Sequence, residues 1–314
     1  MKKNLIILGL AALTLSSCNR FKTAEGGLQY NIHEDADGAS IKEGDFIVIK
    51  GIQRTEKDSV IFSTYDTDRP AFLVCQKPSF NGDLYAGLQL LSEGDSATFK
   101  INLDTLAAKT GQPKPTFAGK DQFIIFTLKV EKVIPKGKLN DSIFGAKIDE
   151  YIKADAEAAK KAEGGKIKSY IQSKSLKVTT TPSGLNYAVA TTGSGPKPAV
   201  GDTVEVNYTG SFMSGKVFDT SNPEVAKKAG VFNAMRPYSP LKVAVGMNQS
   251  IPGFDEGLML FPKGTKATLV IPSTLAYGQQ GGPGIPPFTP LVFEIEVVAI
   301  KAGKAVPPPP PVKK

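Results

Sequence analysis

The C-terminal half of this chain of 314 residues carries spaced aromatic side chains but neither histidine nor cysteine. It therefore lacks a group that ordinarily titrates near neutrality and a soft metal-ligand cluster, so acid–base and metal chemistry are not expected there. An aromatic residue in a strand ordinarily packs in a core, and Asp219 before Thr220 is ordinary for a turn. Aromatic side chains of this kind could instead bind an apolar group in a water-poor pocket. The candidates are Tyr208, Phe218, Asp219, Phe254, Tyr277 and Phe293.

These residues belong to short motifs that follow one another between Val204 and Val298. In chain order the motifs are Val206-Asn207-Tyr208-Thr209-Gly210, Val217-Phe218-Asp219-Thr220-Ser221, Gly253-Phe254-Asp255-Glu256-Gly257, Ile271-Pro272, Ala276-Tyr277-Gly278, Ile285-Pro286-Pro287 and Leu291-Val292-Phe293-Glu294. The segment resembles the FKBP-type peptidyl-prolyl cis-trans isomerases. The resemblance spans about a hundred residues and keeps the family's motif order and nearly its spacing. It implies the X-Pro peptide bond of a polypeptide as substrate, with no cofactor and no metal.

The resemblance also implies individual roles. Tyr277 matches a tyrosine whose hydroxyl donates to the substrate carbonyl, and the backbone N–H of Ile251 would hold the next carbonyl. Asp219 matches a buried carboxylate held by the Tyr208 hydroxyl. Phe254 would form the floor under the proline ring. The implied catalytic residues are Tyr208, Phe218, Asp219 and Tyr277, and the implied substrate-binding residues are Leu241, Ile251, Phe254, Ile285 and Phe293.

Such a pocket suits the chemistry of an X-Pro bond. Its rotation is slow because amide resonance must be lost, at a barrier of about 18–20 kcal/mol. No bond is broken, so no nucleophile is needed. Twisting reduces charge separation on nitrogen and oxygen, and an aromatic pocket with a few fixed donors favours that state over the planar one.

Several positions depart from the common family pattern. Phe254 stands where tryptophan is frequent, Leu241 where a phenylalanine is usual, and Gly282 where a histidine often lies before Ile285. The insert at residues 222–239 is longer than the usual connection. We expect a narrower or shallower pocket, which affects substrate preference and macrolide affinity rather than the mechanism.

An internal repeat accounts for the rest of the length. Matching pairs are Gly27-Leu28-Gln29-Tyr30 with Gly184-Leu185-Asn186-Tyr187, Gly44-Asp45 with Gly201-Asp202, and Ala97-Thr98-Phe99-Lys100-Ile101 with Ala267-Thr268-Leu269-Val270-Ile271. In the first copy the implied site residues are replaced. Gly51 stands opposite Tyr208, Ile61 and Phe62 opposite Phe218 and Asp219, Leu84 opposite Phe254, and Ala107 or Ala108 opposite Tyr277. The first copy is therefore interpreted as a binding or spacing module.

The local patterns predict an α+β protein with two FKBP-like domains, each a curved antiparallel β-sheet wrapped on a short helix, joined by a helical linker. Alternation over 204–208 predicts a strand, and residues 254–260 read as the short helix. Residues 138–175 predict two helices interrupted at Gly164-Gly165. Their apolar stripe either packs on a neighbouring domain or pairs with a second copy as a homodimer. Its members are Ile148, Tyr151, Ile152, Ile167, Tyr170 and Ile171.

The first residues predict export. Lys2-Lys3, a short apolar run and Leu15-Ser16-Ser17-Cys18 resemble a bacterial lipoprotein signal in which Cys18 is lipidated. A plain cleaved signal with an incidental cysteine is the alternative. Asn19 favours the outer membrane, so we expect a lipid-anchored envelope protein facing the periplasm. The predicted division is 1–17 signal, 22–135 degenerate FKBP-like domain, 136–177 helical linker, 178–301 isomerase domain and 302–314 proline-rich tail.

The remaining composition is less specific. The net charge of +8 is spread thinly and includes only four arginines, so nucleic-acid binding has little support. Cys75 is expected to be a buried small hydrophobe, and His33 has no partner at metal-ligand spacing. The predicted function is a prolyl isomerase assisting the folding of exported proteins. The alternative is a non-catalytic envelope chaperone or scaffold lipoprotein that binds polypeptide.

Overall fold

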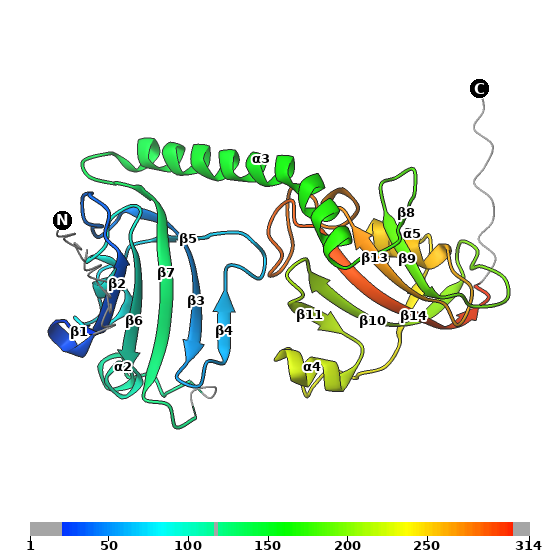
Figure 1. The fold of residues 1–314 in the computed structure, drawn as a ribbon, viewed down its shortest axis with the longest axis horizontal. Helices are drawn as coiled ribbons and strands as arrows, with labels where there is room; N and C mark the ends of the chain where they lie inside the picture. The colour runs from blue at the N-terminus through cyan, green and yellow to red at the C-terminus, as the bar shows by residue number, and fades with distance from the viewer. Residues whose placement is uncertain (1–20, 116–118, 304–314) are drawn as a thin grey trace, which may run out of the picture.

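The computed structural model describes residues 21–115 and 119–303, so the expected leader with Cys18 and nearly all of the proline-rich tail lie outside the described residues. Two seven-stranded antiparallel sheets lie at the two ends of one long helix, α3 (Figure 1). Each sheet curves around its own core. Among the described residues, no helix combines the length and apolar character needed to cross a bilayer.

The described part of the first domain contains seven strands and three short helices. Its elements are β1 (Lys22–Thr23), η1 (Glu25–Gly27), β2 (Gln29–Glu34), β3 (Phe46–Thr55), β4 (Val60–Ser63), β5 (Ala71–Val74), α1 (Leu84–Leu88), β6 (Ser96–Asn102), α2 (Leu103–Thr110) and β7 (Phe123–Ile134). The strand order is β1-β2-β6-β7-β3-β4, and β5 also pairs with β3. Cys75 is buried in this core at 1% exposure, as expected for a small hydrophobe.

The second domain repeats this arrangement. Its elements are β8 (Thr179–Thr180), β9 (Asn186–Thr191), β10 (Thr203–Phe212), β11 (Val217–Thr220), α4 (Pro223–Ala229), β12 (Leu241–Ala244), α5 (Pro252–Met259), β13 (Lys266–Ile271), η3 (Ser273–Leu275) and β14 (Leu291–Lys301). The order β11-β10-β14-β13-β9-β8, with β12 also on β10, is the first order read in reverse. The two-domain α+β prediction is therefore confirmed. Among the described residues, η1 and α2 occur in the first domain alone, whereas η3 and α4, which lies in the insert, occur in the second alone.

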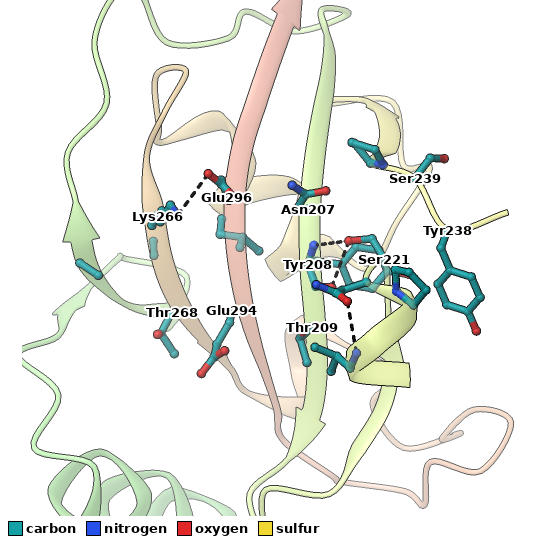
Figure 2. Close-up of a pocket in the computed structure, with 17 residues that line it drawn as sticks. Asn207, Tyr208, Thr209, Ser221, Tyr238, Ser239, Lys266, Thr268, Glu294 and Glu296 are labelled. Atoms are coloured by element: carbon teal, nitrogen blue, oxygen red, sulfur yellow. Dashed lines mark hydrogen bonds and ion pairs between the residues drawn. The ribbon is translucent and has the colours of Figure 1, made fainter. Parts of the chain in front are cut away.

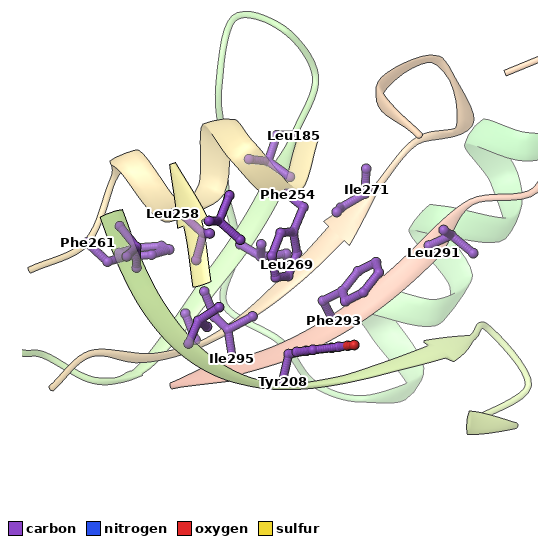
Figure 3. Packing of buried hydrophobic residues seen from close by; sticks show 14 of the residues in the cluster. Leu185, Tyr208, Phe254, Leu258, Phe261, Leu269, Ile271, Leu291, Phe293 and Ile295 are labelled. Carbon is purple, nitrogen blue, oxygen red and sulfur yellow. The ribbon is translucent and has the colours of Figure 1, made fainter. Parts of the chain in front are cut away.

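The second core lies between the sheet and α5 (Figure 3). Burial alternates along β10, so Val206, Tyr208 and Gly210 all face inward. Gly257 lets the helix reach the sheet, because a Cβ there would lie 2.5 Å from a methyl carbon of Leu269. Gly87 of α1 has the same function in the first domain, where a Cβ would lie 2.9 Å from the ring of Phe99.

The linker is one continuous helix, α3 (Asp141–Ser173), of 33 residues. The prediction of two helices broken at Gly164-Gly165 was wrong. Each glycine costs roughly 1 kcal/mol in a helix interior, but this helix is held on both sides of the pair, by Glu163 before it and by Lys166, which pairs with Asp68, after it. Its N-cap is Asn140, whose side chain accepts from the Ile143 N–H at 2.9 Å. Phe144 packs on the first sheet, and Glu163 is buried against the second domain.

The apolar stripe of α3 is used largely within the chain. Ile148 and Tyr151 pack beside Phe46 and Val48 on the outer face of the first sheet. Ile167, Tyr170 and Ile171 are half-buried toward the second domain, whereas Ile152 is exposed. The interpretation of the stripe as a packing surface is thus supported, and pairing with a second copy stays a prediction.

Candidate active site

Four aromatic rings from four elements meet on the concave side of the second sheet. Tyr208 of β10 lies 6.0 Å from Phe254 of α5 and 6.3 Å from Phe293 of β14, between ring centroids. Phe293 also lies 5.0 Å from Phe254 and 5.8 Å from Phe218 of β11. Figure 3 shows Tyr208, Phe254 and Phe293 converging from different elements. Gly210 makes this possible, because a Cβ there would lie 2.8 Å from the rings of Phe218 and Phe293.

A polar cluster borders these rings. The Tyr208 hydroxyl donates to Asp219 Oδ2 at 2.5 Å, which is the hydrogen bond that the resemblance implied. Asp219 Oδ1 accepts from the Thr220 N–H at 2.8 Å and from the Arg236 guanidinium, which also donates to the Tyr208 oxygen at 2.8 Å. Both oxygens of Asp219 therefore have partners.

The cluster shifts two ionisation equilibria. Burial, and then the hydrogen bond to Asp219, raises the pKa of Tyr208 to about 12, so its hydroxyl stays protonated. The hydrogen bond to Asp219 raises the pKa of Arg236 above its already high value. The cluster thus keeps one fixed hydroxyl, one carboxylate and one guanidinium beside the aromatic rings.

Tyr277 and Ile285 come from the long loop between β13 and β14. The η3 turn leads into Tyr277, whose ring packs so closely on Gly282 that a Cβ there would lie 2.8 Å from it. Paired backbone hydrogen bonds between Gly282 and Ile285, of 2.8 and 2.9 Å, close the loop. Ile285 is buried in the second core, whereas Tyr277 is 39% exposed. Among the described residues its hydroxyl has no hydrogen-bond partner, so it is free to donate.

Ile251 precedes α5, and Leu241 lies at the start of β12. The Ile251 carbonyl accepts from the first turn of α5, while its N–H has no partner among the residues described. Ile251 also packs against the second core. Leu241 pairs with Val206 in the sheet and is 38% exposed, so it lies at the rim rather than among the rings.

Arg236 is the site residue that the sequence did not reveal. It lies 17 positions after Asp219, in a loop after α4, within the insert. Phe232 and Tyr238 stack in this loop at 5.2 Å, and the Arg236 guanidinium lies 5.7 Å from the Tyr238 ring. The insert therefore supplies a charged partner to the site besides lengthening the connection. No local pattern marks that partner.

The equivalent region of the first domain is nearly closed. Gly51 pairs with Leu128 as Tyr208 pairs with Ile295, so Gly51 holds the tyrosine's place. A Cβ on Gly51 would lie 2.6 Å from the Thr127 carbonyl oxygen. The hollow beside Gly51 and Phe62 measures about 30 Å³.

His33, in the same domain, is hydrogen-bonded to Thr98 at 2.8 Å. No cluster of metal-ligating side chains occurs within 21–115 or 119–303.

A larger hollow of about 550 Å³ lies on the opposite, convex face of the second sheet (Figure 2). Its lining is mixed. Asn207, Thr268 and Glu294 project from the strands, Lys266 is paired to Glu296 at 3.3 Å, and Pro223, Val225 and Pro240 add apolar surface. Tyr208 and Phe254 present their rings to the other face. This hollow is therefore separate from the ring cluster of Tyr208, Phe254 and Phe293.

Comparison with known proteins identifies the family that the second domain matches. Residues 195–298 match the family described as FKBP-type peptidyl-prolyl cis-trans isomerase. The isomerase FkpA of Aeromonas hydrophila is 38% identical over 160 residues, which are 50% of this chain and 54% of that protein. The outer membrane protein MIP of Legionella longbeachae is 34% identical over 175 residues, 54% of this chain and 68% of that protein. The chain belongs to the FKBP-type peptidyl-prolyl cis-trans isomerase family.

Among solved structures, FkpA from Escherichia coli is similar to this chain at 35% identity and a TM-score of 0.41, covering 52% of this chain and 74% of that one. The isomerase from Pseudomonas syringae is 36% identical with a TM-score of 0.38, covering 46% and 96%. The chain spans a little over half the length of the first curated relatives that it matches.

Proposed function

We propose that the second domain catalyses cis-trans isomerisation of X-Pro bonds in polypeptides. The observation that carries the proposal is the ring cluster of Tyr208, Phe254 and Phe293 beside the Tyr208–Asp219–Arg236 hydrogen bonds. Family membership supports the same reaction class.

The described groups suit the reaction as follows. Phe254 and Phe293 form an apolar floor for the proline ring, where a twisted amide, being less polarised than a planar one, is relatively favoured. The Tyr277 hydroxyl and the Ile251 N–H, neither of which has a partner among the described residues, are two donors able to hold successive carbonyls. Asp219 accepts hydrogen bonds at both oxygens, so it holds the Tyr208 hydroxyl and the Arg236 guanidinium in place beside the rings.

A proline-limited refolding assay on the full chain tests this activity. We expect the slow phase, with a time constant of tens to hundreds of seconds, to accelerate in proportion to the amount of protein. A chain that binds the unfolded polypeptide without accelerating this phase would instead be the non-catalytic chaperone or scaffold.

The first domain is proposed to contribute no turnover, because Gly51 and Leu84 replace Tyr208 and Phe254. In the full chain, Phe218→Ala combined with Tyr277→Phe should therefore reduce catalysis to the uncatalysed rate. Residual turnover that a further first-domain substitution such as Phe62→Ala removes would assign activity to the first domain.

The proposed location is the cell envelope, with a lipid on Cys18 as the anchor in the outer membrane and exported proteins as clients. The proposal rests on the Leu15-Ser16-Ser17-Cys18 pattern, and a similar Legionella longbeachae protein is itself named an outer membrane protein. Cys18→Ala should release the protein from membranes or leave an unprocessed precursor. Membrane association equal to that of the wild type would exclude the lipid anchor.

A further inference from the structure

The linker helix places one buried carboxylate on the second domain. Glu163 of α3 is 8% exposed, and its partner Ser273 is fully buried. One Glu163 oxygen accepts from the Ser273 N–H at 2.5 Å, and the other accepts from the Ser273 hydroxyl at 2.7 Å. The two residues are 110 positions apart, so the contact depends entirely on the tertiary placement of α3.

Ser273 in turn holds the backbone on both sides of Tyr277. Its carbonyl accepts from the Ala276 N–H at 2.9 Å and from the Gly278 N–H at 2.8 Å. The Gly278 carbonyl then accepts from the Phe288 N–H at 2.9 Å, at the end of the loop. Hydrogen bonds therefore connect Glu163 to the segment that carries the free hydroxyl of the site.

The helix is itself fixed to the first domain near this point. Asp155 pairs with Arg69, and Lys166 pairs with Asp68 at 2.5 Å. The Ser214 hydroxyl of the second domain donates to the Asp66 carbonyl at 2.7 Å. The first-domain loop at residues 66–69 therefore contacts both α3 and the second domain. Lys160 also lies 5.6 Å from the Phe288 ring. The ion pairs of Asp155 and Lys166 thus fix α3 on either side of Glu163, which holds its carboxylate against Ser273.

We propose that Glu163 is a positioning residue for Tyr277, which makes the linker helix part of the isomerase site. The proposal rests on the isomerase function proposed above. Removing the carboxylate leaves the buried Ser273 N–H and hydroxyl without an acceptor, so the η3 turn must shift or admit water. A displacement of about 1 Å in a group that contacts substrate can reduce a rate by up to about 10²-fold.

The test compares Glu163→Ala, Glu163→Gln and the control Glu157→Ala in the full chain. Glu157 is an exposed carboxylate on the same helix. We expect kcat/KM to fall about tenfold in Glu163→Ala and about threefold in Glu163→Gln, which keeps one acceptor oxygen. The control should retain wild-type kcat/KM.

Two further measurements separate positioning from a general effect on folding. In a Tyr277→Phe background, Glu163→Ala should change kcat/KM by less than about twofold, because the hydroxyl that it positions is already absent. Amide hydrogen exchange over residues 273–288 should accelerate in Glu163→Ala but not in Glu157→Ala. The proposal would be overturned if Glu163→Ala lowered kcat/KM by the same factor in the Tyr277→Phe background as in the wild type. It would also be overturned if Glu163→Ala left amide exchange over residues 273–288 unchanged.

Exchange also distinguishes this proposal from the proposed function. A wild-type chain without isomerase activity whose loop still loosens in Glu163→Ala would refute the function and retain the positioning contact. If the wild type is active, and Glu163→Ala changes neither its activity nor the exchange of this loop, only the positioning role is refuted.

Discussion

The Tyr208 hydroxyl donates its only proton to Asp219 at 2.5 Å and accepts a hydrogen bond from Arg236 at 2.8 Å. It therefore has no proton left for a substrate carbonyl. The Tyr277 hydroxyl, on the loop between β13 and β14, has no hydrogen-bond partner among the described residues. The two tyrosines thus have different roles. Tyr208 is fixed among the pocket residues, and the Tyr277 hydroxyl is available to bind substrate.

This division predicts different costs for two substitutions. Tyr277→Phe keeps the ring and removes one hydrogen bond, so kcat/KM should fall about tenfold or less. Phe218→Ala removes a ring that packs on Phe212 and Phe293, so its loss should be larger. Peptide isomerisation kinetics on the folded variants measure which substitution lowers kcat/KM more. Unchanged activity in Phe218→Ala would remove Phe218 from the site.

The activity should be nearly independent of pH around neutrality. The second domain contains no histidine or cysteine, and the pKa of Tyr208 is raised to about 12. Catalysed rates, corrected for the uncatalysed reaction, should be flat from about pH 6 to pH 8 and should not change with EDTA. A bell-shaped profile, or a loss with EDTA that added metal restores, would indicate a titrating group or an ion.

Gly282→Ala should reduce activity with little loss of stability. Its Cβ would meet the Tyr277 ring at 2.8 Å, so the ring must move. The φ of Gly282 is not positive, and alanine therefore adds no backbone strain. We expect kcat/KM to fall several-fold and the unfolding midpoint to remain within experimental error. Gln279→Ala, in an exposed position of the same loop, is the matched control and should behave as the wild type.

Asp255→Asn should stabilise the second domain at neutral pH. Asp255 is 8% exposed, its Oδ2 accepts from the Gly246 N–H at 2.8 Å, and its Oδ1 has no partner among the described residues. Burial raises the pKa of this carboxyl above its ordinary value of 3.8. The folded state therefore binds the proton more tightly, and stability decreases as the pH rises from about 4 through the raised pKa.

The asparagine removes this charge while keeping an acceptor for Gly246. We expect a gain on the order of 1 kcal/mol at pH 7 that disappears near pH 3. Urea unfolding at both pH values measures it. A variant less stable than the wild type at pH 7 would show that the ionised carboxylate is favourable there.

The sequence predicted most of the second domain because its signals are local. Alternation over residues 204–208 follows from side chains that point to opposite faces of β10, and Gly257 marks the close contact of α5 with Leu269. The repeat predicted the first domain's strands, and the structure gives the same strand order in both sheets. Resemblance, rather than spacing, singled out the aromatic residues from an ordinary core.

The features that the sequence missed depend on distant contacts. Gly164-Gly165 looks like a helix break, yet α3 continues because Glu163, before the pair, binds the second domain and Lys166, after it, binds the first. Arg236 reaches Asp219 only because the insert folds back over the sheet edge. Its role could not be inferred from its own neighbours in the chain.

Cys75 has a practical consequence. It is the one thiol between residues 21 and 303, it lies in the first domain's core, and burial raises its pKa, which keeps the reactive thiolate scarce. A thiol reagent can therefore label this stretch only when the first domain opens. The rate of labelling reports the opening of that domain alone, so substitutions in either domain can be compared for their effect on it without introducing a dye or a tryptophan.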